Sequence, residues 1–162
     1  MKIRSALAGD AAAIAALWNP FIRDTAVTFN SALKTPQMIA DDIAAKETAG
    51  HPFFLAELPD GLAGFATYGQ FRGGVGYAHS MEHTVILSAR AQGRGVGRAL
   101  MSAIEDHARA SGVHVMMAGV SAENPDGVAF HKAVGYAQVA RIPQVGRKFG
   151  RWMDLVLLQK LL

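Results

Sequence analysis

The chain has 162 residues, of which 51% are hydrophobic and 18% charged, a composition typical of one globular domain with its own buried core. Its formal net charge is +3, but the sixteen Lys and Arg are scattered along the chain apart from a small group at Arg147, Lys148 and Arg151, which argues against a nucleic-acid-binding groove. The absence of cysteine excludes disulfides, zinc–thiolate sites and a cysteine nucleophile.

The first half of the chain is predicted to contain strands and two helices. Apolar residues at helical spacing follow Gly9, with Asp10 as the expected cap, and Thr35–Pro36 is typical of a second helix start. A P-D-G turn between two apolar runs indicates a β-hairpin. The expected elements are a strand over 2–7, a helix from Asp10 to Ile22, a helix from Thr35 to Gly50, and strands over 53–58 and 62–70.

The second half continues without a linker, a repeat or a break in composition. The expected elements are a strand over 77–88, a glycine-rich turn and helix over 90–111, a strand over 113–120, a helix over 125–134, and strands over 136–142 and 152–160. The order β-α-α-β-β-β-α-β-α-β-β predicts one mixed α/β domain, of the α+β type, over residues 1–162.

The first residues, M-K-I-R-S-A, lead directly into the first expected strand, with no apolar signal segment. No apolar run in the sequence is long enough to span a bilayer. We therefore expect a cytoplasmic protein with neither a membrane nor nucleic acid among its partners.

Residues 90–101 read R-A-Q-G-R-G-V-G-R-A-L-M and place three glycines directly before a helical pattern. Glycines let successive backbone N–H groups face one point, and the helix adds the positive end of its dipole, so this segment is suited to bind an anion. Residues 93–98 lack the G-x-G-x-x-G of a dinucleotide loop, and Arg98–Ala99 stand where a phosphate loop requires Lys and Ser or Thr. A plain flexible strand-to-helix turn is the alternative.

The stretch Q-G-R-G-V-G resembles the Q/R-x-x-G-x-G/A signature of the GCN5-related N-acetyltransferases, both in sequence and in its place between a long strand and a helix. The resemblance implies a central, mostly antiparallel twisted sheet flanked by helices, with acetyl-CoA as co-substrate and no metal. It also implies that backbone amides of this loop hold the pyrophosphate of acetyl-CoA, with charge added by its two arginines. The loop residues are Gln92, Gly93, Arg94, Gly95, Val96, Gly97 and Arg98.

Longer stretches are similar to the phosphinothricin and methionine sulfoximine acetyltransferase branch of that family. They are L-W-N-P-F-I at 17–22, T-A-V-T-F at 25–29, Y-A-H-S-M-E-H-T-V at 77–85, E-N-P-D-G-V-A-F-H-K-A-V-G-Y at 123–136 and V-G-R-K-F-G-R-W-M-D at 145–154. The resemblance implies a homodimer in which Lys148, Arg151 and Trp152 of the last stretch approach the partner's site. An ordinary basic hairpin tip is the alternative.

Acetyl transfer from a thioester to an amine needs a base for the ammonium proton and donors for the oxyanion. By resemblance the base is Glu82, whose pKa a partly apolar cleft would raise; a solvated strand carboxylate is the alternative. His83 is expected on the opposite face of the same strand and is a weaker candidate. His131 stands where many relatives carry a tyrosine that protonates the thiolate, and it is an acid, a binding residue or a structural helix histidine.

The resemblance also assigns contacts with acetyl-CoA outside the glycine-rich loop. Val85, Ile86 and Leu87 would offer backbone N–H and C=O groups to the pantetheine arm, as an added strand does. Asn124 would contact acetyl-CoA, and it is equally suited to cap a helix that has Pro125 at its first position.

A small amino acid carries a carboxylate, for which Arg and Tyr side chains and backbone amides are suitable donors. The loop R-G-G-V-G-Y is where the branch holds such a substrate, and an ordinary exposed loop is the alternative. Trp18 and Phe29 would either wall the pocket or belong to the core. The substrate-binding residues implied by the resemblance are Arg72, Val75, Gly76 and Tyr77.

Three functions follow. The first is acetyl-CoA-dependent N-acetylation of a small-molecule amine, an amino-acid analogue of the phosphinothricin, methionine sulfoximine or methionine sulfone type, by direct attack on the thioester. The second is the same chemistry on a polyamine or a peptide N-terminus, which Arg72 and the basic net charge oppose. The third is a non-catalytic sensor of acetyl-CoA, which the carboxylate at position 82 opposes.

Overall fold

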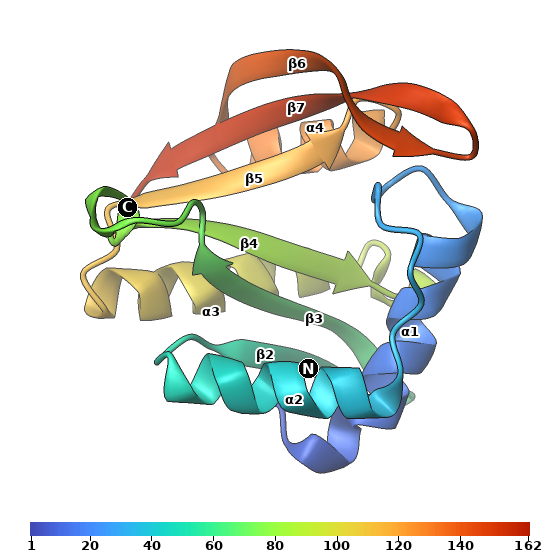
Figure 1. The fold of residues 1–162 in the computed structure, drawn as a ribbon. Helices are drawn as coiled ribbons and strands as arrows, with labels where there is room; N and C mark the ends of the chain where they lie inside the picture. The colour runs from blue at the N-terminus through green and yellow to red at the C-terminus, as the bar shows by residue number, and fades with distance from the viewer.

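The computed structural model describes residues 1–162, and its elements follow the predicted order of strands and helices (Figure 1). Three short 3-10 turns, at Ala8–Asp10, Val75–Tyr77 and Ala89–Ala91, are added to that order. The elements are β1 Lys2–Ser5, α1 Ala11–Asp24, α2 Pro36–Thr48, β2 Phe53–Leu58, β3 Gly61–Gln70, β4 Ser80–Leu87, α3 Val96–Ala110, β5 Val115–Ser121, α4 Pro125–Ala133, β6 Ala137–Lys148 and β7 Arg151–Leu161.

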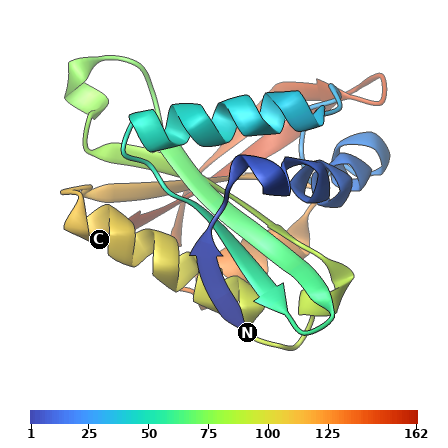
Figure 2. The same ribbon diagram turned by 90° about the horizontal axis from the view of Figure 1, so that it is seen from below.

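The seven strands form one sheet in the order β1-β2-β3-β4-β5-β7-β6. Every neighbouring pair is antiparallel except β4 and β5, which are parallel. Helices α1 and α2 cover one face of the sheet and α3 and α4 cover the other, as the two views show (Figures 1 and 2). The predicted fold class, an α+β domain with a mostly antiparallel sheet flanked by helices, is confirmed.

Each face of the sheet has its own hydrophobic cluster. Helix α3 buries Leu100, Met101 and Ile104 against one face, and these three side chains are no more than 1% exposed. Helices α1 and α2 bury Ile14 and Ile39 against the other face. Apolar residues three or four positions apart point the same way on a helix, so the spacing in the sequence produces these two layers.

The predicted N-terminal cap is confirmed for α2 but only in part for α1. Thr35 caps α2 as expected, since its hydroxyl accepts a hydrogen bond from Met38 N at 3.1 Å. Asp10 stands at the N-cap position of α1, but its side chain makes no capping hydrogen bond to that helix. Its carboxylate instead accepts from Leu7 N at 2.8 Å and pairs with Arg4, because a 3-10 turn precedes the helix. No helix of the chain is both long and apolar enough to cross a membrane.

Two strand boundaries also differ from the prediction. Strand β4 starts at Ser80 rather than residue 77, because Val75–Tyr77 form a 3-10 turn. Strand β6 continues to Lys148 rather than ending at residue 142, and its pairing with β7 shifts register twice. Such shifts break the two-residue alternation by which a strand is recognised in a sequence.

Candidate active site

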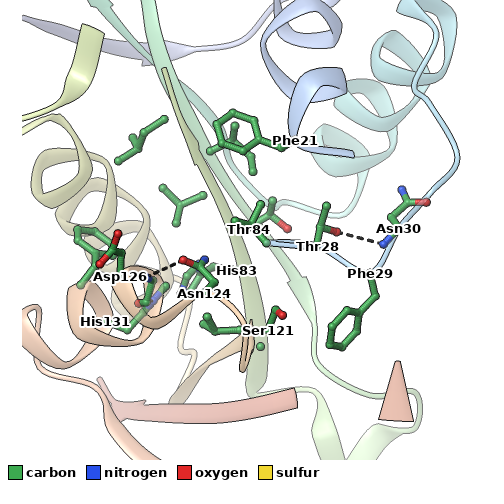
Figure 3. A pocket seen from close by; sticks show the side chains of 18 of the residues that line it. Phe21, Thr28, Phe29, Asn30, His83, Thr84, Ser121, Asn124, Asp126 and His131 are labelled. Atoms are coloured by element: carbon green, nitrogen blue, oxygen red, sulfur yellow. Dashed lines mark hydrogen bonds between the residues drawn. The ribbon is translucent and has the colours of Figure 1, made fainter. Parts of the chain in front are cut away.

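The site is a fork between the two parallel strands. Strands β4 and β5 pair only over Ser80–Glu82 and Val115–Met117, and no pairing continues beyond Glu82. Past this point a cavity of about 620 Å³ lies between them (Figure 3). Its wall comes from α1, the loop after α1, β4, β5, α4 and β7: Trp18, Phe21, Val27, Thr28, Phe29, Asn30, His83, Thr84, Val85, Ile86, Leu87, Gly119, Val120, Ser121, Asn124, Asp126, Gly127, Phe130, His131 and Leu155.

The diverging part of β4 is an unpaired strand edge. It pairs with β3 on one side, from His83 opposite Tyr68 to Leu87 opposite Gly64, and faces the cavity on the other. An antiparallel strand directs the N–H and C=O groups of alternate residues to each side, so those on the cavity side have no strand partner. Val85, Ile86 and Leu87, the predicted pantetheine contacts, all lie on this wall.

Glu82 is the last residue of β4 that pairs with β5. A Cβ built on Gly119, which lines the cavity, would stand 2.7 Å from Glu82 Oε1, so the carboxylate occupies the space that the missing side chain leaves. The carboxylate makes no hydrogen bond or ion pair within the chain. Partial burial raises the pKa of Glu82 above its usual range.

His83 points to the other face of the sheet, as alternation predicted, and lines the cavity from there. Its ring is 8% exposed, stacks on His131 at 5.0 Å between centroids, and meets the edge of Tyr136 at 5.6 Å. Neither ring nitrogen has a hydrogen-bond partner. Desolvation by burial, with a smaller contribution from the nearby His131, lowers the pKa of His83 to about 3, so the ring is neutral.

The geometry of His131 defines its tautomer. Its Nδ1 lies 2.6 Å from Gly127 O, and because a carbonyl can only accept, Nδ1 carries the proton. The Nε2 of the neutral ring is then a lone-pair acceptor, and this atom is buried without a partner. Burial lowers the pKa of His131, and the Gly127 contact only partly opposes this.

The glycine-rich loop lies where β4 leads into α3. Gly93 and Gly95 have φ of 69° and 72°, values that residues with a Cβ rarely adopt. The first hydrogen bond of α3 runs from Ala99 N to Gly95 O at 3.1 Å, so the amides before Ala99 have no intrahelical acceptor. A Cβ on Gly97 would approach Leu87 to 2.9 Å and Phe130 to 3.0 Å, which ties the loop to the cavity wall. The side chains of Gln92, Arg94 and Arg98 in this loop are all exposed.

Asn124 caps α4, because its Oδ1 accepts a hydrogen bond from Gly127 N at 2.9 Å. The helix begins at Pro125, so the predicted capping role is confirmed. The side chain also lines the cavity beside His131 (Figure 3), which is compatible with the predicted contact to acetyl-CoA.

The predicted substrate loop lies apart from this cavity. Arg72, Val75, Gly76 and Tyr77 precede β4, at the end opposite the diverging part, and none of them lines the cavity. The Arg72 guanidinium stacks over the Tyr77 ring at 5.7 Å, and Val75 is 96% exposed. Trp18 and Phe29, the two aromatic residues with an open assignment, do line the cavity.

The residues that sequence reasoning missed come mainly from the loop after α1 and from β5. Val27, Thr28 and Asn30 stand on one wall, and Ser121 and Gly119 on another. The only signal for the loop was the T-A-V-T-F stretch at 25–29. No group of three or more His, Asp or Glu side chains is placed to hold a metal ion.

Comparison with known proteins defines the class. Residues 3–157 match the model of the family described as acetyltransferase (GNAT) domain, so the chain belongs to the GNAT acetyltransferases. Acetyl-CoA is the acetyl donor of this class, and the chain is an enzyme rather than the non-catalytic sensor of our third hypothesis.

Two relatives cover nearly the whole chain. It is 37% identical over 159 residues to the L-amino acid N-acyltransferase MnaT of Escherichia coli, covering 98% of this chain and 92% of the relative. It is 35% identical over 159 residues to the L-methionine sulfoximine/L-methionine sulfone acetyltransferase of Salmonella typhimurium, covering 98% and 93%. The resemblance stated from the sequence is confirmed.

Two solved structures have the same fold. One is the acetyltransferase yncA of Salmonella typhimurium with its cofactor acetyl-CoA, at a TM-score of 0.92 and 34% identity, covering 99% of this chain and 92% of that one. The other is a ribosomal-protein-alanine N-acetyltransferase of Brucella melitensis, at a TM-score of 0.95 and 34% identity, covering 100% of both chains.

Proposed function

We propose that this enzyme transfers the acetyl group of acetyl-CoA to the amine of a small amino-acid analogue of the methionine sulfoximine, methionine sulfone or phosphinothricin type. The observation that carries the proposal is the fork, where a partly buried carboxylate stands at the point of divergence and a free strand edge lies beside it. The names of the two relatives support the acceptor class.

The residues of the fork fit acetyl-CoA. The unpaired edge over Val85–Leu87 suits a pantetheine arm, which carries amide groups like a peptide. The amides of Val96, Gly97 and Arg98, which have no intrahelical acceptor, and the missing side chain at Gly97 suit a pyrophosphate close to the backbone. Arg94 lies 3.4 Å from Asp60, an exposed pair that an anion could compete for, and Arg98 is free to add charge. Acetyl-CoA supplies the activated thioester carbonyl.

Glu82 acts as the base. The acceptor amine is an ammonium ion in water, so it must lose a proton before nitrogen can attack the thioester carbonyl. A carboxylate with a raised pKa is a stronger base than an exposed one, and it takes this proton directly or through a water molecule. The new bond is N–C, the broken bond is C–S, and the second proton of the amine accompanies the departure of the thiolate.

His131 serves as a hydrogen-bond acceptor in this proposal. Its proton is on Nδ1 and donated to Gly127 O, so Nε2 has no proton to give to a thiolate. Its lowered pKa keeps the imidazolium form scarce at neutral pH. We therefore assign Nε2 to an N–H group of acetyl-CoA or to a bound water, among the roles left open by the sequence.

The cavity wall offers no positive charge to the acceptor's carboxylate. Asp126 is the only formally charged residue on that wall, and it is acidic. The loop with Arg72, Val75, Gly76 and Tyr77 has the required chemistry, since its arginine lacks an ion-pair partner. We propose that this loop, from the same chain or from a second copy, binds the carboxylate.

A homodimer is part of the proposal. Strand β6 is an edge of the sheet. More than half of four large apolar side chains is exposed here: Val139 and Val145 on β6, Phe149 in the turn that follows, and Trp152 at the start of β7. An exposed edge with apolar residues favours pairing with a second copy. Sedimentation equilibrium should give twice the chain mass, and the mass of a single chain would contradict the dimer.

A peptide N-terminus is the second candidate acceptor, favoured by the likeness to the ribosomal-protein-alanine N-acetyltransferase. The deciding experiment measures acetyl-CoA-dependent thiol release with methionine sulfoximine, methionine sulfone, phosphinothricin, common amino acids, a polyamine and a short peptide. Saturable turnover confined to amino acids and their analogues is expected. Turnover only with the peptide or the polyamine would overturn the assigned acceptor and leave the chemistry of Glu82 in place.

A further inference from the structure

The turn between β6 and β7, Lys148–Arg151, contacts the segments that lead into two sides of the cavity. Its central residues Phe149 and Gly150 have φ of 53° and 73°, as in a type I′ hairpin turn. This turn makes Lys148 and Arg151 direct cross-strand partners. The two basic side chains nevertheless bind different parts of the molecule.

Lys148 binds the loop that follows α1. Its Nζ donates to Thr25 O at 2.6 Å and to Thr28 O at 2.9 Å, two carbonyls at the start of the segment that lines the cavity. Lys148 is only 4% exposed and forms no ion pair. Burial lowers its pKa, and the nearby Asp24 opposes this. Burying an ammonium group costs free energy unless its N–H groups donate hydrogen bonds. Here two of the three donate to carbonyl oxygens.

A second contact holds the same loop. A Cβ on Gly146, two residues before Lys148, would overlap the ring of Phe29. The ring therefore packs directly on the β6 backbone, next to the register shift that ends at Gly146. Phe29 lies on the cavity wall (Figure 3), so this strand supports the wall from behind.

Arg151 binds Glu123, the residue next to Asn124 on the other side of the cavity. Its guanidinium lies 2.6 Å from Glu123 Oε1, and Glu123 directly precedes Asn124, the cap of α4. Both side chains of this pair are about half exposed, so solvent screens the pair and it contributes little to stability. Lys148 is thus the stronger of the two attachments.

We infer that the Lys148–Arg151 turn is a brace that sets the acceptor side of the cavity, with Lys148 as a positioning residue. This inference rests on the proposed function. The amine must reach Glu82, whose side chain lies on the face of the sheet covered by α1 and α2. Residues 27–30 form the cavity wall on that face, so their placement decides how the acceptor is held.

The experiment compares Lys148→Met with Lys2→Met, the same chemical change at an exposed residue of β1. The first readout is chymotrypsin cleavage after Phe29 in the free protein, followed as release of fragment 1–29. Loss of the two hydrogen bonds that the charged Lys148 donates should raise the cleavage rate about tenfold or more in Lys148→Met, and Lys2→Met should match the wild type. The second readout is kinetic: the acceptor KM should rise about tenfold while the Kd of acetyl-CoA stays unchanged.

The readouts separate the inference from the proposed function. An unchanged cleavage rate would overturn the brace, and faster cleavage with an unchanged acceptor KM would overturn its role in holding the acceptor. If the wild type acetylates none of the acceptors tested, the proposed function fails and cleavage alone decides the brace. If Lys148→Met does not fold, Gly146→Ala, which displaces Phe29 from behind, should raise the same cleavage, and an unchanged rate would overturn the brace. Lys148→Arg keeps charged donors at this position, so its acceptor KM should be closer to that of the wild type than to that of Lys148→Met.

Discussion

The two halves of the β4–β5 pair perform different tasks. In the first half, Ser80–Glu82 of β4 are paired with Val115–Met117 of β5, and the Glu82 carboxylate at the end of this pairing lies beside Gly119. In the second half the strands diverge, and β4 turns an unpaired edge and the ring of His83 toward a cavity. The paired half therefore fixes the position of the Glu82 side chain. The diverging half leaves backbone N–H and C=O groups of β4 unpaired, so a ligand can bind them.

Burial also shifts the pKa of a titratable group in each half. Burial raises the pKa of Glu82 in the paired half, which favours the uncharged carboxyl but makes the carboxylate a better proton acceptor. Across the sheet, burial lowers the pKa of His83 at the start of the diverging half. The fork therefore carries two titratable groups shifted in opposite directions, on opposite faces of one strand.

The largest effect is expected from replacing Glu82, the proposed base in the paired half. Glu82→Gln keeps the shape of the side chain but cannot accept the ammonium proton, so kcat should fall by about 10²–10⁴-fold, the usual contribution of a general base. The Kd of acetyl-CoA should not change, because the contacts proposed for it lie in the diverging half. Steady-state kinetics and calorimetric titration provide both values. A kcat within threefold of the wild type would remove Glu82 as the base.

In the wild type the same assignment predicts the direction of the pH profile. The base works as the carboxylate, so kcat/KM should rise with pH through a pKa above 4.5. This limb should be absent in Glu82→Gln. An identical profile in both proteins would mean that another group titrates.

The next effect concerns the first residue of the diverging half. The pKa of His83 is about 3 in the folded chain, against 6.5 for a histidine in water, so the unfolded state binds its proton first as pH falls. Stability should thus be lost progressively below pH 6.5, by roughly 2 kcal/mol at pH 5 from this group. Urea unfolding of wild type and His83→Phe at pH 7.5 and pH 5 measures the difference. Equal losses in both proteins would show that His83 is not the cause.

A smaller effect is expected at the loop beyond the diverging half. Gly95→Ala forces a residue with a Cβ to φ near 72°, which costs roughly 1–2 kcal/mol and disturbs the amides before Ala99. The Kd of acetyl-CoA should rise about tenfold with little change in the acceptor KM. Ser102→Ala, at an exposed position later in α3, serves as the control. Unchanged binding of acetyl-CoA in Gly95→Ala would argue against the loop as the pyrophosphate site.

Sequence reasoning succeeded where the signal is local. The glycine-rich loop and the Asn124 cap need only a few successive residues, because φ and capping act within one turn. The element order followed from periodicity for the same reason. The contact of Lys148 with Thr28 spans 120 residues and ends on a carbonyl that every residue possesses, so the sequence contains no sign of it. The full length of β6 was not predicted, because two register shifts interrupt the alternation of its inward- and outward-facing residues.

The smallest expected effect tests the boundary between the two halves. A Cβ at Gly119 would stand 2.7 Å from Glu82 Oε1, and the far end of a flexible side chain can move away at little cost. Gly119→Ala should therefore fold with nearly unchanged stability, while kcat falls about fivefold because the base is displaced from its position. Gly9→Ala, where a Cβ would also meet no atom within 4 Å and which lies outside the proposed sites, is the matched control. If Gly119→Ala keeps the wild-type kcat, the position of the carboxylate does not depend on the missing side chain. If its kcat falls only in the presence of Glu82, and not further in the Glu82→Gln background, then Gly119 acts through the base.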